Sequence, residues 1–135
     1  MANALYDKAR EAFLTGAINW STDTIKAVLV DTGAYTVNIS THQFLADIAA
    51  GARIATSAAL SSKTVAAGVA DAADSLFTAV SGASVEAVVL YKDTGTAGTS
   101  NLIAYIDTAS GLPVTPNGGD ITVAWDNGAN KIFKL

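Results

Sequence analysis

Two copies of the tripeptide Asp-Thr-Gly come closest, in type and spacing, to a catalytic arrangement in this sequence. The first, Asp31-Thr32-Gly33, directly follows the apolar run Val28-Leu29-Val30, and the second is Asp93-Thr94-Gly95. Two aspartates brought together would share one proton, because two like charges at close range cannot both ionise. The chemistry to consider first is therefore that of a carboxylate pair.

Residues 28–34 resemble the active-site strand of retroviral-type aspartic proteases, in which an apolar strand carries Asp-Thr-Gly-Ala and two copies face each other. That family also has an apolar-apolar-Gly brace late in the chain, where this sequence has Leu102-Ile103-Ala104-Tyr105. The family also has a glycine-rich flap hairpin, and this sequence has no suitable one between its two motifs. Asp93 follows Lys92, whereas the family's aspartate follows an apolar strand. We therefore expect each aspartate to accept backbone hydrogen bonds in a turn, with a protease as the remote alternative.

The other residues capable of chemistry are isolated in the sequence. His42 is the only histidine, and we expect it on the surface or half-buried. The absence of cysteine excludes disulfides and thiolate metal sites. Gly118-Gly119 precedes an expected strand, so it is not a phosphate loop. Four acids could help to hold calcium, but they form no twelve-residue calcium loop: Asp71, Asp74, Asp107 and Asp120. We expect no catalytic, cofactor-binding or metal site.

The elements that position these residues are mostly short strands. Alternation of apolar residues predicts a strand over 24–30, with Ile25, Ala27 and Leu29 on one face, and the clearest strand over 84–91. Asn127-Gly128 predicts a hairpin between 121–126 and 131–135. The signals over 53–60 and 63–69 are weak because alanine is a poor strand former. Further strands are expected over 75–80 and 102–107, with a short one over 35–39.

Two segments have helical spacing. A helix is predicted over 4–15, with Asn3 as its cap and Gly16 at its end, and a short helix over 41–48, capped by Ser40 or Thr41. The predicted fold is mainly β: a single-domain β-sandwich or barrel of about eight short strands, with an N-terminal helix and one short internal helix. The domain spans 1–135, with an N-terminal helical arm over 1–20 and a β core over 21–135.

Composition points to contacts with other proteins. Charged residues make up 15% of the chain, below the usual quarter, and the net charge is −4. The basic residues do not cluster, so the electrostatic footprint of a nucleic-acid binder is missing. No apolar run reaches the roughly 18 residues of a membrane span, and no secretory signal is visible. We expect neither nucleic acid nor membrane as a partner.

The N-terminal segment is the best candidate for an interface. Leu5 and Phe13 share the apolar stripe of the expected helix, and Ile18 and Trp20 follow in the loop after it. This stripe either docks on a neighbouring subunit or caps the chain's own sheets. Trp125 is expected in the core, on the same strand face as Ile121 and Val123.

Strings of residues along the whole chain are similar to a family of small proteins encoded among the virion structural genes of tailed bacteriophages. They are Tyr6-Asp7-Lys8, Gly16-Ala17-Ile18-Asn19-Trp20, Thr22-Asp23-Thr24-Ile25-Lys26, Leu29-Val30-Asp31-Thr32-Gly33, 102–107, 111–121, Trp125-Asp126 and Lys131-Ile132-Phe133. The family carries no enzymatic motif, so the resemblance implies a non-enzymatic part of the virion, assembled in the bacterial host cytoplasm. It also implies the major capsid protein or other virion proteins as partners, with the chain homo-oligomeric or bound to their lattice.

Two structural roles fit this resemblance. A capsid decoration or cement protein, which clamps neighbouring capsid subunits, suits a short single-domain chain that lacks the coiled coils or repeats of fibres. A tail, connector or fibre-associated protein is the alternative, because a tail-tube subunit is also small and mainly β. We expect the decoration role. A carbohydrate-binding module would require more exposed aromatic residues than the ten in this chain.

Overall fold

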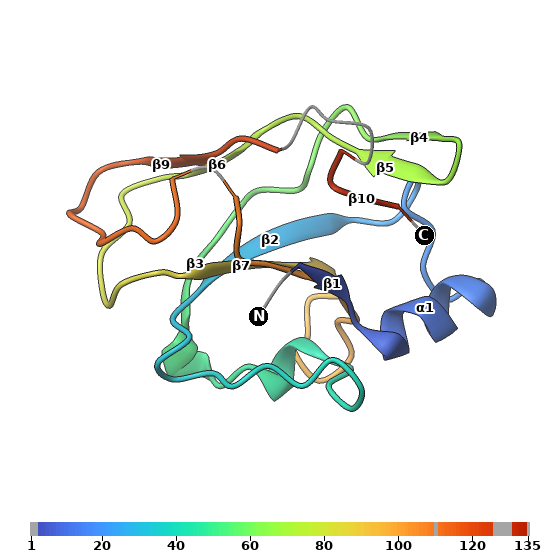
Figure 1. Cartoon of the computed structure of the whole chain (residues 1–135), viewed down its shortest axis with the longest axis horizontal. Coiled ribbons are helices and arrows are strands. Elements are labelled where there is room, and N and C mark those ends of the chain that lie inside the picture. The colour runs from blue at the N-terminus through green and yellow to red at the C-terminus, as the bar shows by residue number, and fades with distance from the viewer. Residues whose placement is uncertain (1–2, 110, 126–130, 135) are drawn as a thin grey trace.

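The protein has a mainly β fold, as the sequence predicts, in which two β layers are followed by a layer of loops and short helices (Figure 1). The computed structural model describes residues 3–109, 111–125 and 131–134. Within these residues, ten short strands form three antiparallel sheets, accompanied by one α-helix near the N-terminus and two 3-10 helices.

The central sheet has five antiparallel strands in the order β1-β8-β7-β2-β3. Its three inner strands are nearly continuous apolar runs and are buried on both faces, as expected of strands sandwiched between two layers. They confirm the strands predicted over 24–30, 84–91 and 102–107. The bounds are β1 Ala4–Leu5, β2 Ile25–Val30, β3 Arg53–Thr56, β7 Ala87–Lys92 and β8 Leu102–Ile106.

A second β layer covers one face of the central sheet (Figure 1). It consists of a three-stranded sheet, β10-β5-β4, and a separate β6-β9 pair. Its bounds are β4 Thr64–Ala66, β5 Val69–Asp71, β6 Ser75–Phe77, β9 Ile121–Val123 and β10 Phe133–Lys134. The first core lies between these two layers, where Leu29 of the central sheet belongs to the same cluster as Phe77 and Trp125.

The opposite face of the central sheet is covered by α1 (Asp7–Leu14), the 3-10 helices η1 (Leu45–Asp47) and η2 (Ala50–Ala52), and the loops around them (Figure 1). A second core forms there and includes Val28 and Val30, whereas Ile25, Ala27 and Leu29 belong to the first core. The alternation of side chains predicted for the strand over 24–30, which is β2, is therefore confirmed.

The predicted C-terminal hairpin is wrong. β9 pairs with β6 in the register Phe77↔Ile121, and β10 pairs with β5 in the register Phe133↔Ala70. The expected turn over 126–130 lies outside the described residues. The two segments therefore bury their apolar side chains beside different partners, and a local Asn-Gly signal cannot override that choice.

Three further local predictions need correction. Residues 35–39 form no strand, and the helix predicted over 41–48 is reduced to η1, which begins after Phe44 instead of Ser40 or Thr41. The strand predicted over 63–69 is broken by a tight turn at Ala67 and Gly68, whose φ angles are 51° and 77°. Alanine is costly at positive φ, so nothing in the sequence signalled a hairpin there.

The N-terminal helix is shorter than predicted and lacks the predicted cap. Tyr6, without a capping side chain, precedes α1, while Gly16 follows it with a φ of 79°, as expected of a helix-ending glycine. The Asn3 side-chain oxygen instead accepts a hydrogen bond from the backbone N–H of Asp107, at 2.9 Å.

Candidate functional site

The two Asp-Thr-Gly motifs lie at opposite ends of one strand pair. Strands β2 and β7 are antiparallel, with Ile25 opposite Lys92 and Val30 opposite Ala87. Asp31 follows one end of β2, whereas the backbone N–H of Asp93 donates to Thr24 O at the other end. At about 3.3 Å per strand residue, the motifs are on the order of 20 Å apart. The chain therefore does not bring the two carboxylates together.

Each aspartate instead caps its own turn. The Gly33 N–H donates to Asp31 Oδ1 at 2.8 Å, and the Gly95 N–H donates to Asp93 Oδ1 at 3.0 Å. This bond from an aspartate to the N–H two residues later is the Asx-turn that stabilises loops after strands. The turn role expected for both aspartates is confirmed.

Glu86 fastens the first turn to the start of β7, a role that the sequence did not reveal. Its Oε1 accepts hydrogen bonds from Thr32 N at 2.9 Å and Thr32 Oγ1 at 3.0 Å, and its Oε2 accepts one from Ser84 Oγ at 2.5 Å. Burial raises the pKa of the Glu86 carboxyl, but the hydrogen bonds from Ser84 and Thr32 outweigh burial and hold it below the usual range. The Glu86 carboxylate is thus charged, and its hydrogen bonds have a structural role.

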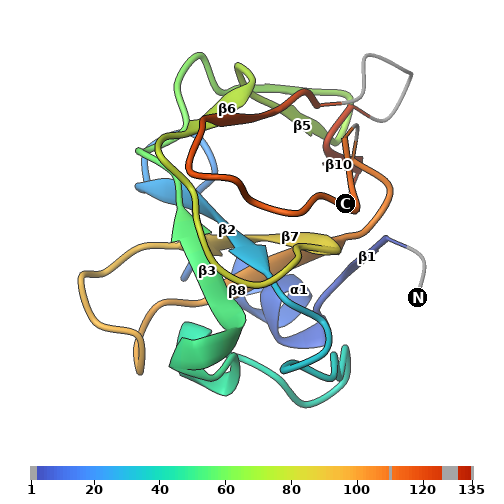
Figure 2. The same ribbon diagram turned by 90° about the vertical axis from the view of Figure 1, so that its left-hand side faces the viewer.

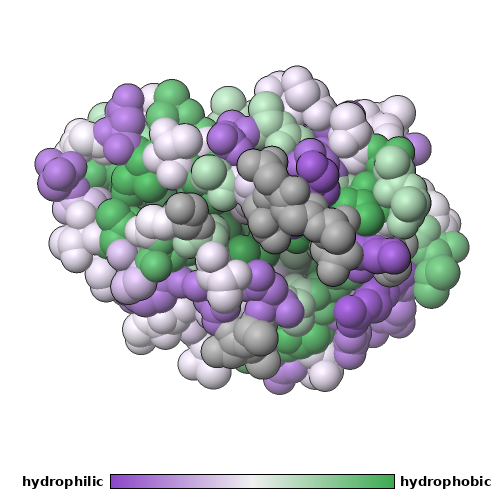
Figure 3. All heavy atoms as spheres, turned by 45° about the horizontal axis from the view of Figure 1, so that its top comes forward, coloured by the Kyte–Doolittle hydropathy of each residue, from purple (hydrophilic) through white to green (hydrophobic). Residues whose placement is uncertain are grey.

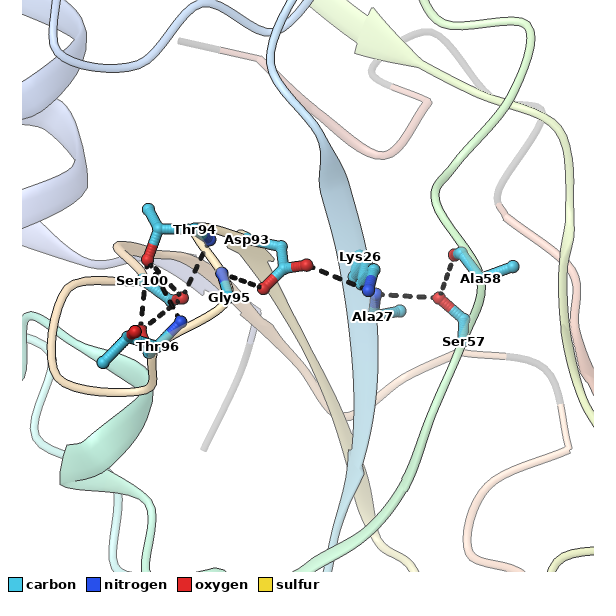
Figure 4. A network of polar contacts seen from close by, with 9 residues as sticks. All are labelled: Lys26, Ala27, Ser57, Ala58, Asp93, Thr94, Gly95, Thr96 and Ser100. Atoms are coloured by element: carbon cyan, nitrogen blue, oxygen red, sulfur yellow. Dashed lines mark hydrogen bonds and ion pairs between the residues drawn. The ribbon is translucent and has the colours of Figure 1, made fainter.

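The second aspartate forms an ion pair across the edge of the same strand pair (Figure 4). Asp93 Oδ2 lies 2.9 Å from Lys26 Nζ, and both side chains are partly buried. The hydrogen bond from Lys26, followed by that from Gly95 N–H, lowers the pKa of the Asp93 carboxyl. The same bond raises the pKa of Lys26. Both groups therefore hold their charges for the ion pair and are not poised to exchange protons.

Hydroxyl groups in the loop after β7 are bound within the loop (Figure 4). Ser100 Oγ accepts from Thr94 N at 3.1 Å and donates to Thr96 O at 2.8 Å. The loop is joined to η1 because Leu45 N donates to Ser100 O at 2.8 Å. Ser57 similarly joins Ala27 N to Ala58 O. These hydroxyls serve the backbone and form no serine-base pair.

His42 takes part in a hydrogen-bonded chain at the edge of the second core. Tyr6 and Tyr35 hydroxyls lie 2.9 Å apart, and Tyr35 Oη lies 2.8 Å from His42 Nδ1. Tyr6 is fully buried and His42 half-buried, the exposure expected for His42. These hydrogen bonds link the residue before α1 to the loop that follows β2.

The four acids considered for calcium do not gather. Asp74 Oδ1 accepts from Trp125 N at 3.1 Å, and Asp120 Oδ1 accepts from Ala79 N at 2.9 Å. Asp71 lies in β5 and Asp107 follows β8. Over the described part of the chain, no three His, Cys, Asp or Glu residues are close enough to hold a metal ion.

The four predicted interface residues face the chain's own core. Leu5, Ile18 and Trp20 are 5%, 3% and 4% exposed, and Phe13 packs against the same first core. Trp20 meets the ring of Phe133 edge-on at 5.2 Å between ring centres. Because β1 also pairs with β8, this segment contributes a strand to the central sheet. Of its two expected roles, the structure favours the cap on the chain's own sheets.

The remaining surface carries few large apolar groups. Those exposed within the described residues are Leu14 at 85%, Val65 at 57% and Leu76 at 50%. Apolar and polar residues are intermixed over the face shown in Figure 3. A groove of about 340 Å³ separates 56–61 from 74–78 and is lined mainly by alanine, serine and threonine. Within the described residues, no helix has the length and hydrophobicity needed to cross a bilayer.

Comparison with models of known protein families finds none that the chain matches, and comparison with curated protein sequences finds no similar protein.

Proposed function

We propose that the protein is a non-enzymatic structural component of a tailed-bacteriophage virion and that it decorates the capsid by binding the lattice of major capsid protein. The placement of the Asp-Thr-Gly motifs carries the non-enzymatic part of this proposal. Asp31 and Asp93 each cap a turn, at opposite ends of the β2–β7 pair, so the single resemblance to an enzyme has an alternative physical explanation.

The phage part of the proposal is supported by the resemblance that runs along the sequence. A small β protein with few charged residues suits a many-copy surface component, since interface centres are depleted of charge. Decoration is favoured over a tail or connector role by the same features that favoured it in the sequence, namely the short chain and the lack of repeats or coiled coils.

The test is to locate the protein in particles of a phage that encodes it. Heads and tails are separated, and the chain is quantified in each by mass spectrometry. The proposal expects the protein with purified heads, in many copies, and rebinding to heads from which it has been stripped. Its presence with tails alone would replace decoration by the tail role, and its absence from particles would overturn the virion assignment.

A further inference from the structure

A groove of about 360 Å³ lies where two sheets end beside each other. β1 is the last strand of the central sheet, and β10 is the last strand of the three-stranded sheet. Figure 2 shows both strands on one side of the molecule, with β10 above β1. The groove is lined by residues of both strands and by their neighbours in β8 and α1. Ligand pockets usually exceed about 300 Å³, so the space is sufficient for a short segment of chain.

The groove is positively charged in a protein whose net charge is −4. Arg10, Lys131 and Lys134 line it, and among the described residues no aspartate or glutamate does. Arg10 is already paired with Asp7 at 3.2 Å. Neither lysine has a carboxylate partner among the described residues. Two lysines that have no carboxylate partner among the described residues thus line a groove on a protein of net negative charge.

The same groove offers apolar contacts and strand edges. Leu5 and Phe133 line it, together with Ile132. Within the described residues, β1 pairs only with β8 and β10 only with β5, so each strand has one edge without a neighbour in its sheet. Such edges present backbone N–H and C=O groups to an incoming strand, whose alternating side chains then fill the adjacent pockets. On β1, Leu5 O already accepts a long hydrogen bond from Arg10 Nη1, at 3.5 Å, which an incoming strand would have to replace.

We propose that this groove binds an extended acidic peptide segment of a neighbouring virion protein, which adds as a strand to the edge of β1 or β10. The carboxylates of the segment pair with Lys131 and Lys134, and its alternate apolar side chains contact the half-buried Ile132 and Phe133. This inference rests on the proposed virion role. The groove suits a peptide better than nucleic acid, because a strand edge can form backbone hydrogen bonds with a peptide and cannot form them with a phosphate backbone.

The test uses the full chain and two synthetic libraries of capped heptapeptides. Both have Val, Ile or Thr at odd positions; even positions carry Asp or Glu in one library and Lys or Arg in the other. The wild-type protein should retain the acidic library and not the basic one. Reversing both charges, with Lys131→Glu and Lys134→Glu, should weaken retention about tenfold or more. Lys8→Glu, which reverses a charge outside the groove, should have little effect.

A second pair of changes guards against misfolding. Lys131→Gln with Lys134→Gln removes the charges without introducing repulsion and should weaken retention to a smaller extent, with an unchanged circular dichroism spectrum. Equal retention of both libraries, or no effect of charge reversal, would overturn the groove assignment. Preferential retention of a single-stranded oligonucleotide would do the same.

Failure of the virion proposal gives a different result. If the protein is absent from particles but retains the acidic library through the two lysines, the groove stands and its partner lies elsewhere. If the protein is present on heads but ignores the acidic library, the virion role stands and the groove is wrong.

Discussion

In the hydrogen bonds that join Tyr6, Tyr35 and His42, each group donates to the next, from Tyr6 to Tyr35 and from Tyr35 to His42. The Asn38 N–H donates to His42 Nδ1 at 3.3 Å, so this ring nitrogen is an acceptor. The Tyr35 hydroxyl must then donate to His42, at 2.8 Å, which leaves its oxygen to accept from Tyr6. Each phenol proton is therefore held by a defined partner in a buried site, and removing it on ionisation breaks the chain.

Alkaline pH should destabilise the protein through these phenols. Burial raises the pKa of Tyr35 to about 12 and that of Tyr6 further, from an ordinary value of about 10. The folded state binds these protons more tightly than the unfolded state, so their stabilising contribution is fully present below about pH 10. It is lost as the pH rises towards about 12. Urea unfolding at several pH values should show this fall.

Tyr35→Phe provides the control, because phenylalanine has no proton to lose. The variant should be less stable at neutral pH by about 1–2 kcal/mol, since Tyr6 and His42 each lose a partner. Its stability should fall less steeply between about pH 10 and pH 12. A pH dependence identical to that of the wild type would show that Tyr35 does not contribute to the alkaline loss.

Acid should destabilise the protein through Glu86 and Asp93. Both carboxyls have a lowered pKa in the folded state, the first through hydrogen bonds that outweigh burial and the second through Lys26. Their stabilising contribution is present above the unfolded pKa, near 4, and is lost as the pH falls through the folded pKa. Glu86→Gln should therefore lower the free energy of unfolding by about 1 kcal/mol at neutral pH. The stability of this variant should also fall less steeply as the pH is lowered below about 4. Glu11→Gln, on an exposed helix pair, should do neither.

Residue roles were predictable from the sequence only where partners are close in the chain. The turns at Asp31 and Asp93 followed from the preference of Asp and Gly for turns, because the bonded groups are two residues apart. Glu86 lies 54 residues from Thr32, and Tyr6 lies 29 residues from Tyr35. Contacts at such separations depend on sheet topology and leave no periodic signal.

Among the elements, the N-terminal segment should prove essential to the fold. Deleting 2–16 removes β1, α1 and the fully buried Tyr6, which together cover the end of the central sheet. The truncated chain should lose its cooperative thermal transition, because two cores then open at one edge. Retention of that transition, with a β-type circular dichroism spectrum, would mean that the segment is an arm after all.

Trp125 follows β9 and packs in the first core. It is 5% exposed, and its indole nitrogen has no hydrogen-bond partner among the described residues. Trp125→Ala should cost about 3–5 kcal/mol, a large part of the roughly 5–15 kcal/mol of a typical domain. Trp125→Phe should cost much less, since it keeps apolar volume and removes the unpartnered N–H. Equal melting temperatures for Trp125→Ala and the wild type would place the ring outside the core.

The sequence predicted elements well where burial imposes a strong pattern. The strands β2, β7 and β8 are rich in Val, Ile, Leu and Tyr, and all three were located correctly. Residues 53–71 are rich in alanine, which favours neither a strand nor one face of a sheet, so the β4–β5 turn was missed. The C-terminal error arose differently, because strand pairing there is decided by distant partners.

At the scale of the whole molecule, burial of the central sheet contributes to the low charge content. The central sheet is covered on both faces, so β7 and β8 have almost no position that faces water. Such strands require apolar residues throughout and reduce the charged fraction of a small chain without any external partner. Composition alone therefore could not locate an interface, and the side chains first proposed for it lie inside. The neighbouring edges of β1 and β10, beside Lys131 and Lys134, are a more specific candidate for the interface.

If that edge binds the particle, one end of the molecule should become protected. The chain has no cysteine, so single substitutions give unique sites for a thiol reagent. Ala4→Cys marks β1 without removing a groove lysine, and Leu76→Cys marks β6, which lies to the left of β10 in Figure 1 and where Leu76 is 50% exposed. On particles, the cysteine at 4 should react about tenfold more slowly than in the free protein, as expected for a site buried under a partner strand. The cysteine at 76 should keep its rate. Protection of 76 alone would place the contact at the β6–β9 end, and equal rates at both positions would contradict attachment through the β1–β10 groove.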